Sequence, residues 1–109
     1  MPLRLTLDTA SVTIHRVIAS FADRDTEALF NRERPKRIDP RIQRAALRKL
    51  RYLNSAASLD DLRVPSGNRL EALAGDRAGQ HSIRVDEQWR IVFRWRAGNA
   101  HDVAIVDYH

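Results

Sequence analysis

The sequence predicts a small α+β domain in which two N-terminal helices pack on a twisted antiparallel sheet of about four strands. The first observation is the stretch from residue 67 to residue 95, whose pattern predicts three short strands joined by two turns. The second is the tail Val103–His109, whose apolar residues predict a fourth strand. The third is the order of the elements, helices before a meander, which is typical of domains with helices on one sheet face.

The central strand of this sheet is expected near residues 89–96, where apolar and polar side chains alternate. Neighbouring side chains of a strand point to opposite faces, so one face is expected to be apolar and covered by the helices. The other face carries three arginines, which suits a polyanionic ligand. The apolar set is Trp89, Ile91, Phe93 and Trp95, and the opposite set is Arg90, Val92, Arg94 and Arg96.

The first helix is expected to follow a short strand at residues 18–21. Asp23 has the side chain of a helix N-cap. The helix is expected to end near Arg34, because a residue that precedes proline avoids the helical region of backbone space.

The second helix is expected to begin at Asp39-Pro40, with Asp as the cap and Pro at the first helical position, and to end near Asn54. One face is apolar and the other is strongly basic. Two interpretations of the basic face are open: a solvated outer face, or a ridge that binds phosphates or an acidic partner. Like charges one turn apart repel each other and lower the stability of the helix, which favours the interpretation that the ridge binds a ligand. The apolar stripe is Ile42, Ala46, Leu50 and Leu53, and the basic one is Arg41, Arg44, Arg48 and Arg51.

Composition narrows the class of protein. The chain has 109 residues, a formal net charge of +5 and no cysteine, so it offers neither disulfides nor thiolate metal sites. Its pI of about 10.7 favours nucleic acid or another acidic partner. No apolar run approaches the length of a membrane span, and the first residues lack the apolar core of a signal peptide. We therefore expect a cytoplasmic protein without membrane contact.

Motifs for metals and cofactors are missing from the sequence. The four histidines lack metal-ligand spacing, and no phosphate-binding glycine loop or dinucleotide fingerprint is present. If the protein is an enzyme, it is expected to work without a metal ion or a cofactor.

The C-terminal residues Asp107, Tyr108 and His109 offer groups for metal-free RNA cleavage beside an arginine-rich sheet face. Such cleavage needs a base for the 2′-hydroxyl, cationic groups at the phosphate and an acid for the leaving oxygen. His109 titrates near neutral pH, and Arg90 is a suitable cation. A frayed, solvent-exposed chain end remains the alternative interpretation of these residues.

The stretch GNRLEALAGDRAGQHSIRVDEQWRIVFRW and the ending VAIVDYH resemble the HigB-type toxins of the RelE/ParE superfamily, and the similarity extends over residues 18–109. The resemblance implies a small RelE-like fold and a toxin of a type II toxin–antitoxin system. It implies a ribosome-dependent mRNA endonuclease that inhibits translation, with the ribosome and mRNA as partners. A helix-turn-helix, HigA-like antitoxin is implied as well, and operator DNA would be bound only through the antitoxin complex.

The resemblance also implies functional roles for single residues. Arg90, Asp107, Tyr108 and His109 match the family's pattern at the site. Glu71 stands where well-known members have a histidine; it is a candidate base, although a carboxylate does not have the properties of a neutral imidazole. Ala74 stands where those members have a lysine. Candidates for contacts with RNA or the ribosome are Arg94, Arg96, Arg84, Arg77, Arg41, Arg44, Arg48 and Arg51.

The toxin domain is expected at residues 17–109, preceded by an extension at residues 1–16. Relatives typically begin just before an IxSF-like strand, where this chain has Val17. A GTG codon is read as valine internally and as methionine at a start. We therefore expect residues 1–16 to be either disordered or upstream of the true start of translation.

Two other functions remain open from the sequence. One is a ParE-like gyrase poison, although the DYH ending and Arg90 argue against it. The other is a catalytically degenerate protein that binds nucleic acid or an antitoxin. Substitution of His109 would separate the toxin from the degenerate protein, because only RNA cleavage should be lost.

Overall fold

The computed structural model describes residues 16–108 and confirms the α+β class expected from the sequence. Its helices are α2 (Arg24–Phe30) and α3 (Pro40–Ser55). Its strands are β2 (Glu71–Ala72), β3 (His81–Arg84), β4 (Trp89–Arg96) and β5 (Asn99–Asp107). Short 3-10 helices occur at Leu59–Arg63, Ser66–Asn68 and Gly75–Arg77. The expectation for the N-terminal extension falls on residues 1–15, which lie outside this range.

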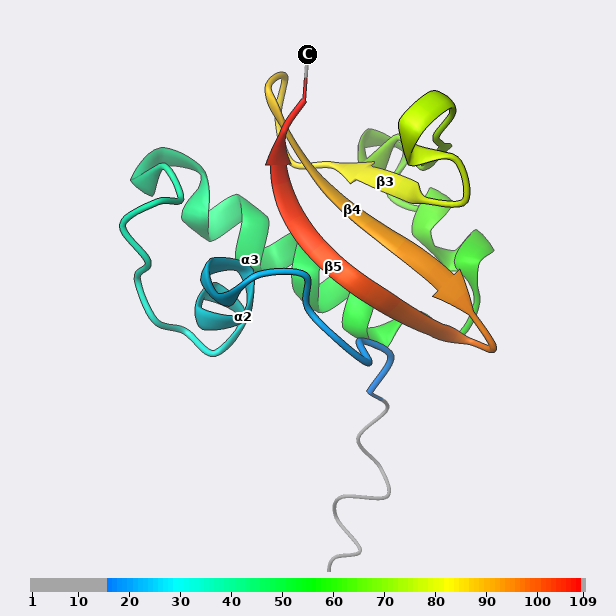
Figure 1. Ribbon diagram of the computed structural model, residues 1–109, viewed down its shortest axis with the longest axis horizontal. Helices are drawn as coiled ribbons and strands as arrows, with labels where there is room; N and C mark the ends of the chain where they lie inside the picture. Colours follow the sequence, from blue (N-terminus) through cyan, green and yellow to red (C-terminus); the bar gives the residue numbers. More distant parts are fainter. Residues whose placement is uncertain (1–15, 109) are drawn as a thin grey trace, which may run out of the picture.

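The four strands form one antiparallel sheet in the order β2-β3-β4-β5, and α3 crosses behind β4 and β5 in Figure 1. Residues directly opposite each other on paired strands share a sheet face. The register pairs Glu71 with Ser82, Ser82 with Val92, and Arg84 with Arg90. These five side chains therefore lie on one face, which we call the open face, and α3 covers the other.

Helix α2 begins as expected and ends early. The Asp23 carboxylate accepts a hydrogen bond of 2.7 Å from the Thr26 backbone N–H, so the predicted cap is confirmed. The helix stops at Phe30 rather than near Arg34. Arg32 adopts a left-handed conformation with φ of 68°, which turns the chain out of the helix before Pro35 acts on it.

Helix α3 confirms the prediction from its cap and its apolar stripe. Asp39 caps it and Pro40 is its first residue. Its inward residues pack against β4 and β5, and one of them is a lysine, Lys49, which is only 7% exposed. The buried residues of α3 are Ile42, Ala46, Lys49, Leu50 and Leu53.

The strand expected at residues 18–21 is not formed. This segment makes only two isolated parallel bridges, to Ala100 and Val103 of β5. Its hydrogen bonds run from the Ala19 N–H to the Ala100 carbonyl (2.8 Å) and from the Ala22 N–H to the Val103 carbonyl (2.9 Å). The segment therefore borders the edge of β5 without a continuous ladder.

Strand β5 departs from expectation at its start and in its middle. It begins at Asn99, earlier than the expected Val103, because the turn at residues 97–98 is tight. A bulge places Asp102 and Val103 opposite the single residue Phe93, and Asp102 has a φ of 53°. Burial does not alternate strictly along β4 either, because Val92 on the open face is only 1% exposed.

The hydrophobic core lies between α3 and the covered face of the sheet. It combines α3 with the inward residues of β3, β4 and β5, and Phe93 is its largest fully buried side chain. Burial of such side chains is the main favourable contribution to folding. Among residues 16–108, no helix combines the length and apolar character that a bilayer-spanning segment requires.

Candidate functional site

The centre of the open face is the guanidinium of Arg90. Its Nη1 donates to the Ser82 hydroxyl at 2.8 Å and forms an ion pair with the Glu71 carboxylate at 3.0 Å. The same nitrogen lies 3.4 Å from the backbone carbonyl oxygen of Arg69. The side chain of Arg90 is 13% exposed and that of Glu71 is 52% exposed. Three acceptors from two chain segments therefore hold one side of the guanidinium in place.

The same guanidinium lies over the ring of Tyr108. The Cζ of Arg90 is 5.3 Å from the centre of the Tyr108 ring, within the range of a cation–π contact. The Tyr108 N–H donates to the Gln88 carbonyl at 2.7 Å, so the chain continues beside the β3–β4 turn after β5 has ended. The structure thus brings together Arg90, Glu71 and Tyr108, three of the five residues expected at the catalytic site, and we call these three the Arg90 cluster.

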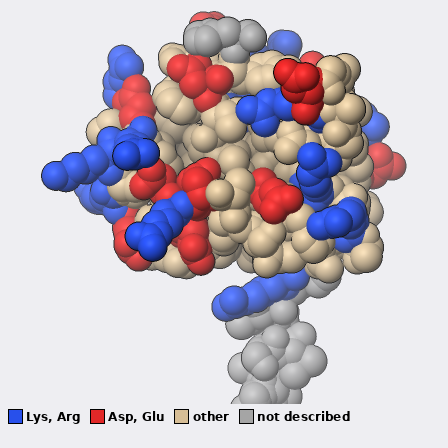
Figure 2. Space-filling model, viewed as in Figure 1, with Lys and Arg blue, Asp and Glu red and all other residues tan. Residues whose placement is uncertain are grey.

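The arginines expected on this sheet face have acidic neighbours. Basic and acidic side chains are interspersed on the face seen in Figure 2. Arg90 is paired with Glu71, and the Arg94 Nε lies 3.9 Å from the Asp102 carboxylate. The pairing arises because strand register and the bulge of β5 bring acids beside arginines that are remote in sequence. A phosphate ligand would meet single arginines there, not a uniform positive field.

The other arginines of the sheet and its loops are placed separately. Arg84 donates from Nε to the Asp86 carbonyl at 3.1 Å, and Arg77 donates to the Gln80 side chain at 3.2 Å. Arg96, at the end of β4, is exposed. Gly79 approaches the Arg94 guanidinium so closely that an added Cβ would lie 2.9 Å from Nη1.

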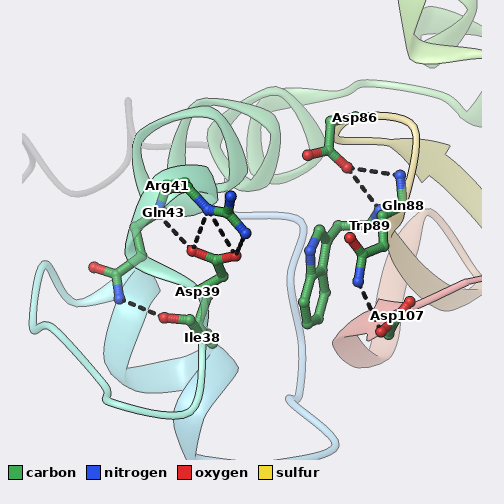
Figure 3. A network of polar contacts seen from close by, with 8 residues as sticks. All are labelled: Ile38, Asp39, Arg41, Gln43, Asp86, Gln88, Trp89 and Asp107. Carbon is green, nitrogen blue, oxygen red and sulfur yellow. Dashed lines mark hydrogen bonds and ion pairs between the residues drawn. The ribbon is translucent and has the colours of Figure 1, made fainter.

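Asp107 lies on the opposite side of the sheet from Arg90. The register pairs it with Trp89, whose side chain belongs to the covered face. The Gln88 side-chain amide donates to its carboxylate at 2.9 Å, as Figure 3 shows. Asp107 is therefore held at the strand end and is not brought to the Arg90 cluster.

The β3–β4 turn that receives the end of β5 is itself fixed by Asp86. Its carboxylate accepts hydrogen bonds from the backbone N–H groups of Gln88 (2.8 Å) and Trp89 (2.7 Å). Gln88 then binds the C-terminal segment twice, through its side chain to Asp107 and through its carbonyl to Tyr108. His109 lies outside the described residues.

Sequence reasoning missed the contact that anchors the loop before β2. The buried ammonium of Lys49 donates to the Asn68 side-chain oxygen. The Asn68 amide donates to the carbonyls of Leu62 (3.1 Å) and Val64 (3.3 Å), and Asn68 is fully buried. This anchor holds the chain just before Arg69, whose carbonyl faces Arg90. The only signal for it in the sequence was a lysine within the apolar stripe of α3.

The basic stripe of α3 divides into one paired and three unpaired arginines. Arg41 binds the Asp39 carboxylate through Nε and Nη2 at 2.8–3.2 Å, so it already has an acidic partner, unlike the other three. This side-chain contact lowers the pKa of Asp39 below its ordinary 3.8. Within residues 16–108, the other three are exposed and make no side-chain hydrogen bond or ion pair. We call Arg44, Arg48 and Arg51 the α3 ridge.

The described part of the chain contains no group of three or more histidine and acidic side chains arranged to hold a metal ion. A hollow of about 500 Å³ lies along α2 and the following loop, away from Arg90.

Comparison with known proteins gives two matches. A family model described as the RelE-like toxin of the type II toxin–antitoxin system HigB matches residues 19–109. Toxin HigB-1 of Vibrio cholerae serotype O1 is 41% identical over 81 residues, which cover 73% of this chain and 85% of that protein. The region matched by the family model contains both helices, the whole sheet and the Arg90 cluster.

Proposed function

The chain belongs to the RelE-like HigB toxins of type II toxin–antitoxin systems, and on that premise we propose that it is a ribosome-dependent mRNA endonuclease. Its action would inhibit translation and arrest growth. The observation that carries the proposal is the Arg90 cluster: one anchored guanidinium with a carboxylate at 3.0 Å and a phenol ring against it. Those groups suit cleavage of RNA through its own 2′-hydroxyl.

In the proposed reaction the 2′-oxygen attacks the neighbouring phosphorus while its proton passes to a base. The bond from phosphorus to the 5′-oxygen breaks, and the leaving oxygen receives a proton from an acid. The products are a 2′,3′-cyclic phosphate and a 5′-hydroxyl end. Negative charge grows on the phosphoryl oxygens in the transition state, and the Arg90 guanidinium would stabilise it.

Glu71 is the proposed base. A phosphate bound to Arg90 would lie beside the Glu71 carboxylate, because the ion pair places the two side chains 3.0 Å apart. Glu71 is half exposed, so it can leave Arg90 when RNA arrives. His109 is the proposed acid, and Tyr108 would support the Arg90 guanidinium or stack on a base of the RNA. Asp107 would act indirectly, by fixing the strand end that carries Tyr108 and His109.

The α3 ridge is proposed to contact ribosomal RNA. Its three arginines are exposed and lack partners among the described residues, whereas Arg41 is already bound to Asp39. Phosphate contacts of this kind supply affinity without sequence preference and weaken with salt. Arg77, Arg84, Arg94 and Arg96 are further candidates on the sheet side.

A type II toxin has an antitoxin as its partner. We propose that this antitoxin is a HigA-like helix-turn-helix protein, that operator DNA is bound only through the complex, and that the toxin acts in the cytoplasm without a cofactor.

The proposal is tested by primer extension on purified mRNA, with and without translating ribosomes. We expect cuts in phase with codons when ribosomes are present and none on free mRNA. The variant His109→Gln should lose the cuts and still bind the antitoxin. The proposal would be contradicted if soluble, antitoxin-free protein left mRNA uncut on translating ribosomes. A gyrase assay would then follow.

A further inference from the structure

Among residues 16–108, Arg90 is held through one of its three guanidinium nitrogens. Nη1 faces the Ser82 hydroxyl, the Glu71 carboxylate and the Arg69 carbonyl. Within residues 16–108, Nε and Nη2 have no hydrogen-bond or ion-pair partner. A guanidinium offers its donors as a planar fork, and the Nε–Nη2 edge can bind two oxygens of one phosphate. The contacts at Nη1 therefore leave a phosphate-binding edge open.

The three acceptors at Nη1 differ in how firmly they are held. Nη1 carries two hydrogens, so three acceptors compete for two donors. Glu71 is half exposed at the end of the short edge strand β2, and the Arg69 carbonyl is the most distant of the three at 3.4 Å. Ser82 is fully buried in β3, between β2 and β4, and its contact is the shortest at 2.8 Å. Ser82 is thus the one acceptor that a ligand cannot displace.

Tyr108 restricts the remaining freedom of the guanidinium. Its ring lies against Arg90 with 5.3 Å between Cζ and the ring centre. The hydroxyl of Ser82 fixes the position of Nη1, and the ring limits rotation of the guanidinium plane. Together they determine where the Nε–Nη2 edge points.

We propose that Ser82 is a positioning residue that holds Arg90 by Nη1 so that the Nε–Nη2 edge receives the scissile phosphate. The inference rests on the proposed RNA cleavage and deepens it. Glu71 is the exchangeable partner: it neutralises Arg90 in the free protein and is released to take the 2′-proton when the phosphate binds. Ser82 keeps Arg90 in place through this exchange. It touches neither the RNA nor the transferred protons.

The first experiment measures single-turnover cleavage of mRNA on programmed ribosomes with Ser82→Ala and Ser82→Thr. Loss of a hydrogen bond to a charged group predicts a fall of about 10-fold in the rate at saturating toxin for Ser82→Ala. The half-saturating concentration should change by less than about two-fold, because Arg90 acts on charge that develops in the transition state. Ser82→Thr keeps the hydroxyl and should restore most of the rate.

The second experiment observes Arg90 directly, without RNA. Protein labelled with ¹⁵N-arginine is compared by NMR of the guanidinium groups, and the signals that vanish in Arg90→Lys identify Arg90. Restricted rotation should give separate Nη1 and Nη2 signals in the natural protein and in Ser82→Thr. In Ser82→Ala the two signals should merge, because the fixed acceptor is gone.

Thr26→Val is the matched control for loss of a buried hydroxyl. Thr26 is 1% exposed, and its hydroxyl accepts from the Ile105 N–H at 3.0 Å, away from Arg90. This variant should lower stability and leave the Arg90 signals separate.

The outcomes separate this inference from the proposed function. Natural protein that leaves mRNA uncut overturns the proposed function, and the NMR comparison still tests whether Ser82 fixes Arg90. Cleavage by Ser82→Ala at the natural rate, or separate Arg90 signals in that variant, overturns the role of Ser82. An equal loss of rate in Ser82→Ala, Ser82→Thr and Thr26→Val would also overturn it, since general destabilisation would then explain the result.

Discussion

The contact between Lys49 and Asn68, which anchors the loop before β2, gives the largest predicted effect of a single substitution on the free energy of unfolding. Asn68→Ala removes the acceptor of the buried Lys49 ammonium and the donor to the Leu62 and Val64 carbonyls. Bulk water does not replace these contacts, because Asn68 is fully buried and Lys49 is only 7% exposed. The variant therefore leaves a cation without its hydrogen-bond acceptor and two carbonyls without their side-chain donor.

The expected loss follows from these three hydrogen bonds. A bond to a charged group contributes about 2 kcal/mol, and each neutral bond contributes about 1 kcal/mol. Asn68→Ala should therefore lower the free energy of unfolding by about 4 kcal/mol, a large part of the ~5–15 kcal/mol typical of a domain. For a domain of this size, the midpoint of thermal unfolding should fall by about 15–20 °C.

Urea unfolding followed by tryptophan fluorescence measures this loss, because Trp89 and Trp95 are half-buried against the core. Ser66→Ala, at an exposed site in the same 3-10 turn, is the matched control and should unfold like the natural protein. The double variant Asn68→Ala, Lys49→Met should be more stable than Asn68→Ala alone, since the uncompensated charge is gone. A loss below about 1 kcal/mol for Asn68→Ala would refute the reasoning.

Three further predictions concern pH and salt. Burial lowers the pKa of Lys49 below its ordinary 10.5, and the nearby charge of Arg48 lowers it further. Between the native and the unfolded pKa of Lys49, the unfolded chain therefore binds more protons than the native chain. The free energy of unfolding should then rise with pH towards 10.5, and urea titrations of Lys49→Met should lack that part of the slope. The pKa of Asp39 is lowered below 3.8 by its contact with Arg41, so the stabilisation is present above 3.8 and is lost as pH falls through the folded value. Urea midpoints of Asp39→Asn should not show this acid loss. Replacement of all three arginines of the α3 ridge by glutamine should weaken ribosome binding in a pelleting assay. The slope of log affinity against log salt concentration should become shallower, by an amount that corresponds to the loss of up to about three phosphate contacts. Unchanged binding would exclude the ridge from the interface.

Local patterns in the sequence were sufficient to predict α3 and the outline of the sheet. Asp39-Pro40 defines a helix start by capping and backbone geometry alone, and Ile42 and Leu50 define its buried face by spacing. The turn at residues 86–88 is similarly local, because the Asp86 carboxylate binds the N–H groups that follow it.

Features that depend on contacts between distant segments could not be predicted. The bulge at Asp102 arises from pairing of β4 with β5, and Val92 is buried although the alternation places it on the arginine-bearing face. The Lys49 contact joins α3 to a turn that is remote in sequence, so no local pattern indicates that this lysine is buried.

The candidate site was predicted in part. Arg90, Glu71 and Tyr108 were named from the sequence. The register of β2, β3 and β4 brings Glu71 to Arg90, and the hydrogen bond from Tyr108 to Gln88 places Tyr108 beside them. Asp107 was expected at the same site, but the strand register places it opposite Trp89 on the covered face, whereas Tyr108 follows the end of β5 and lies against Arg90. Ser82 was missed because a lone serine in a strand gives no signal until its partner across the sheet is known.

The most direct test of the central claim compares two carboxylate variants on programmed ribosomes. Glu71→Gln removes the proposed base at Arg90, and Glu87→Gln removes an exposed carboxylate of the β3–β4 turn as the matched control. Codon-phased cleavage should be rapid in the natural protein and in Glu87→Gln. Loss of a proton-transfer group should slow it by about 100-fold or more in Glu71→Gln. Cleavage by Glu71→Gln at the natural rate would contradict the assignment of the Arg90 cluster as the catalytic site.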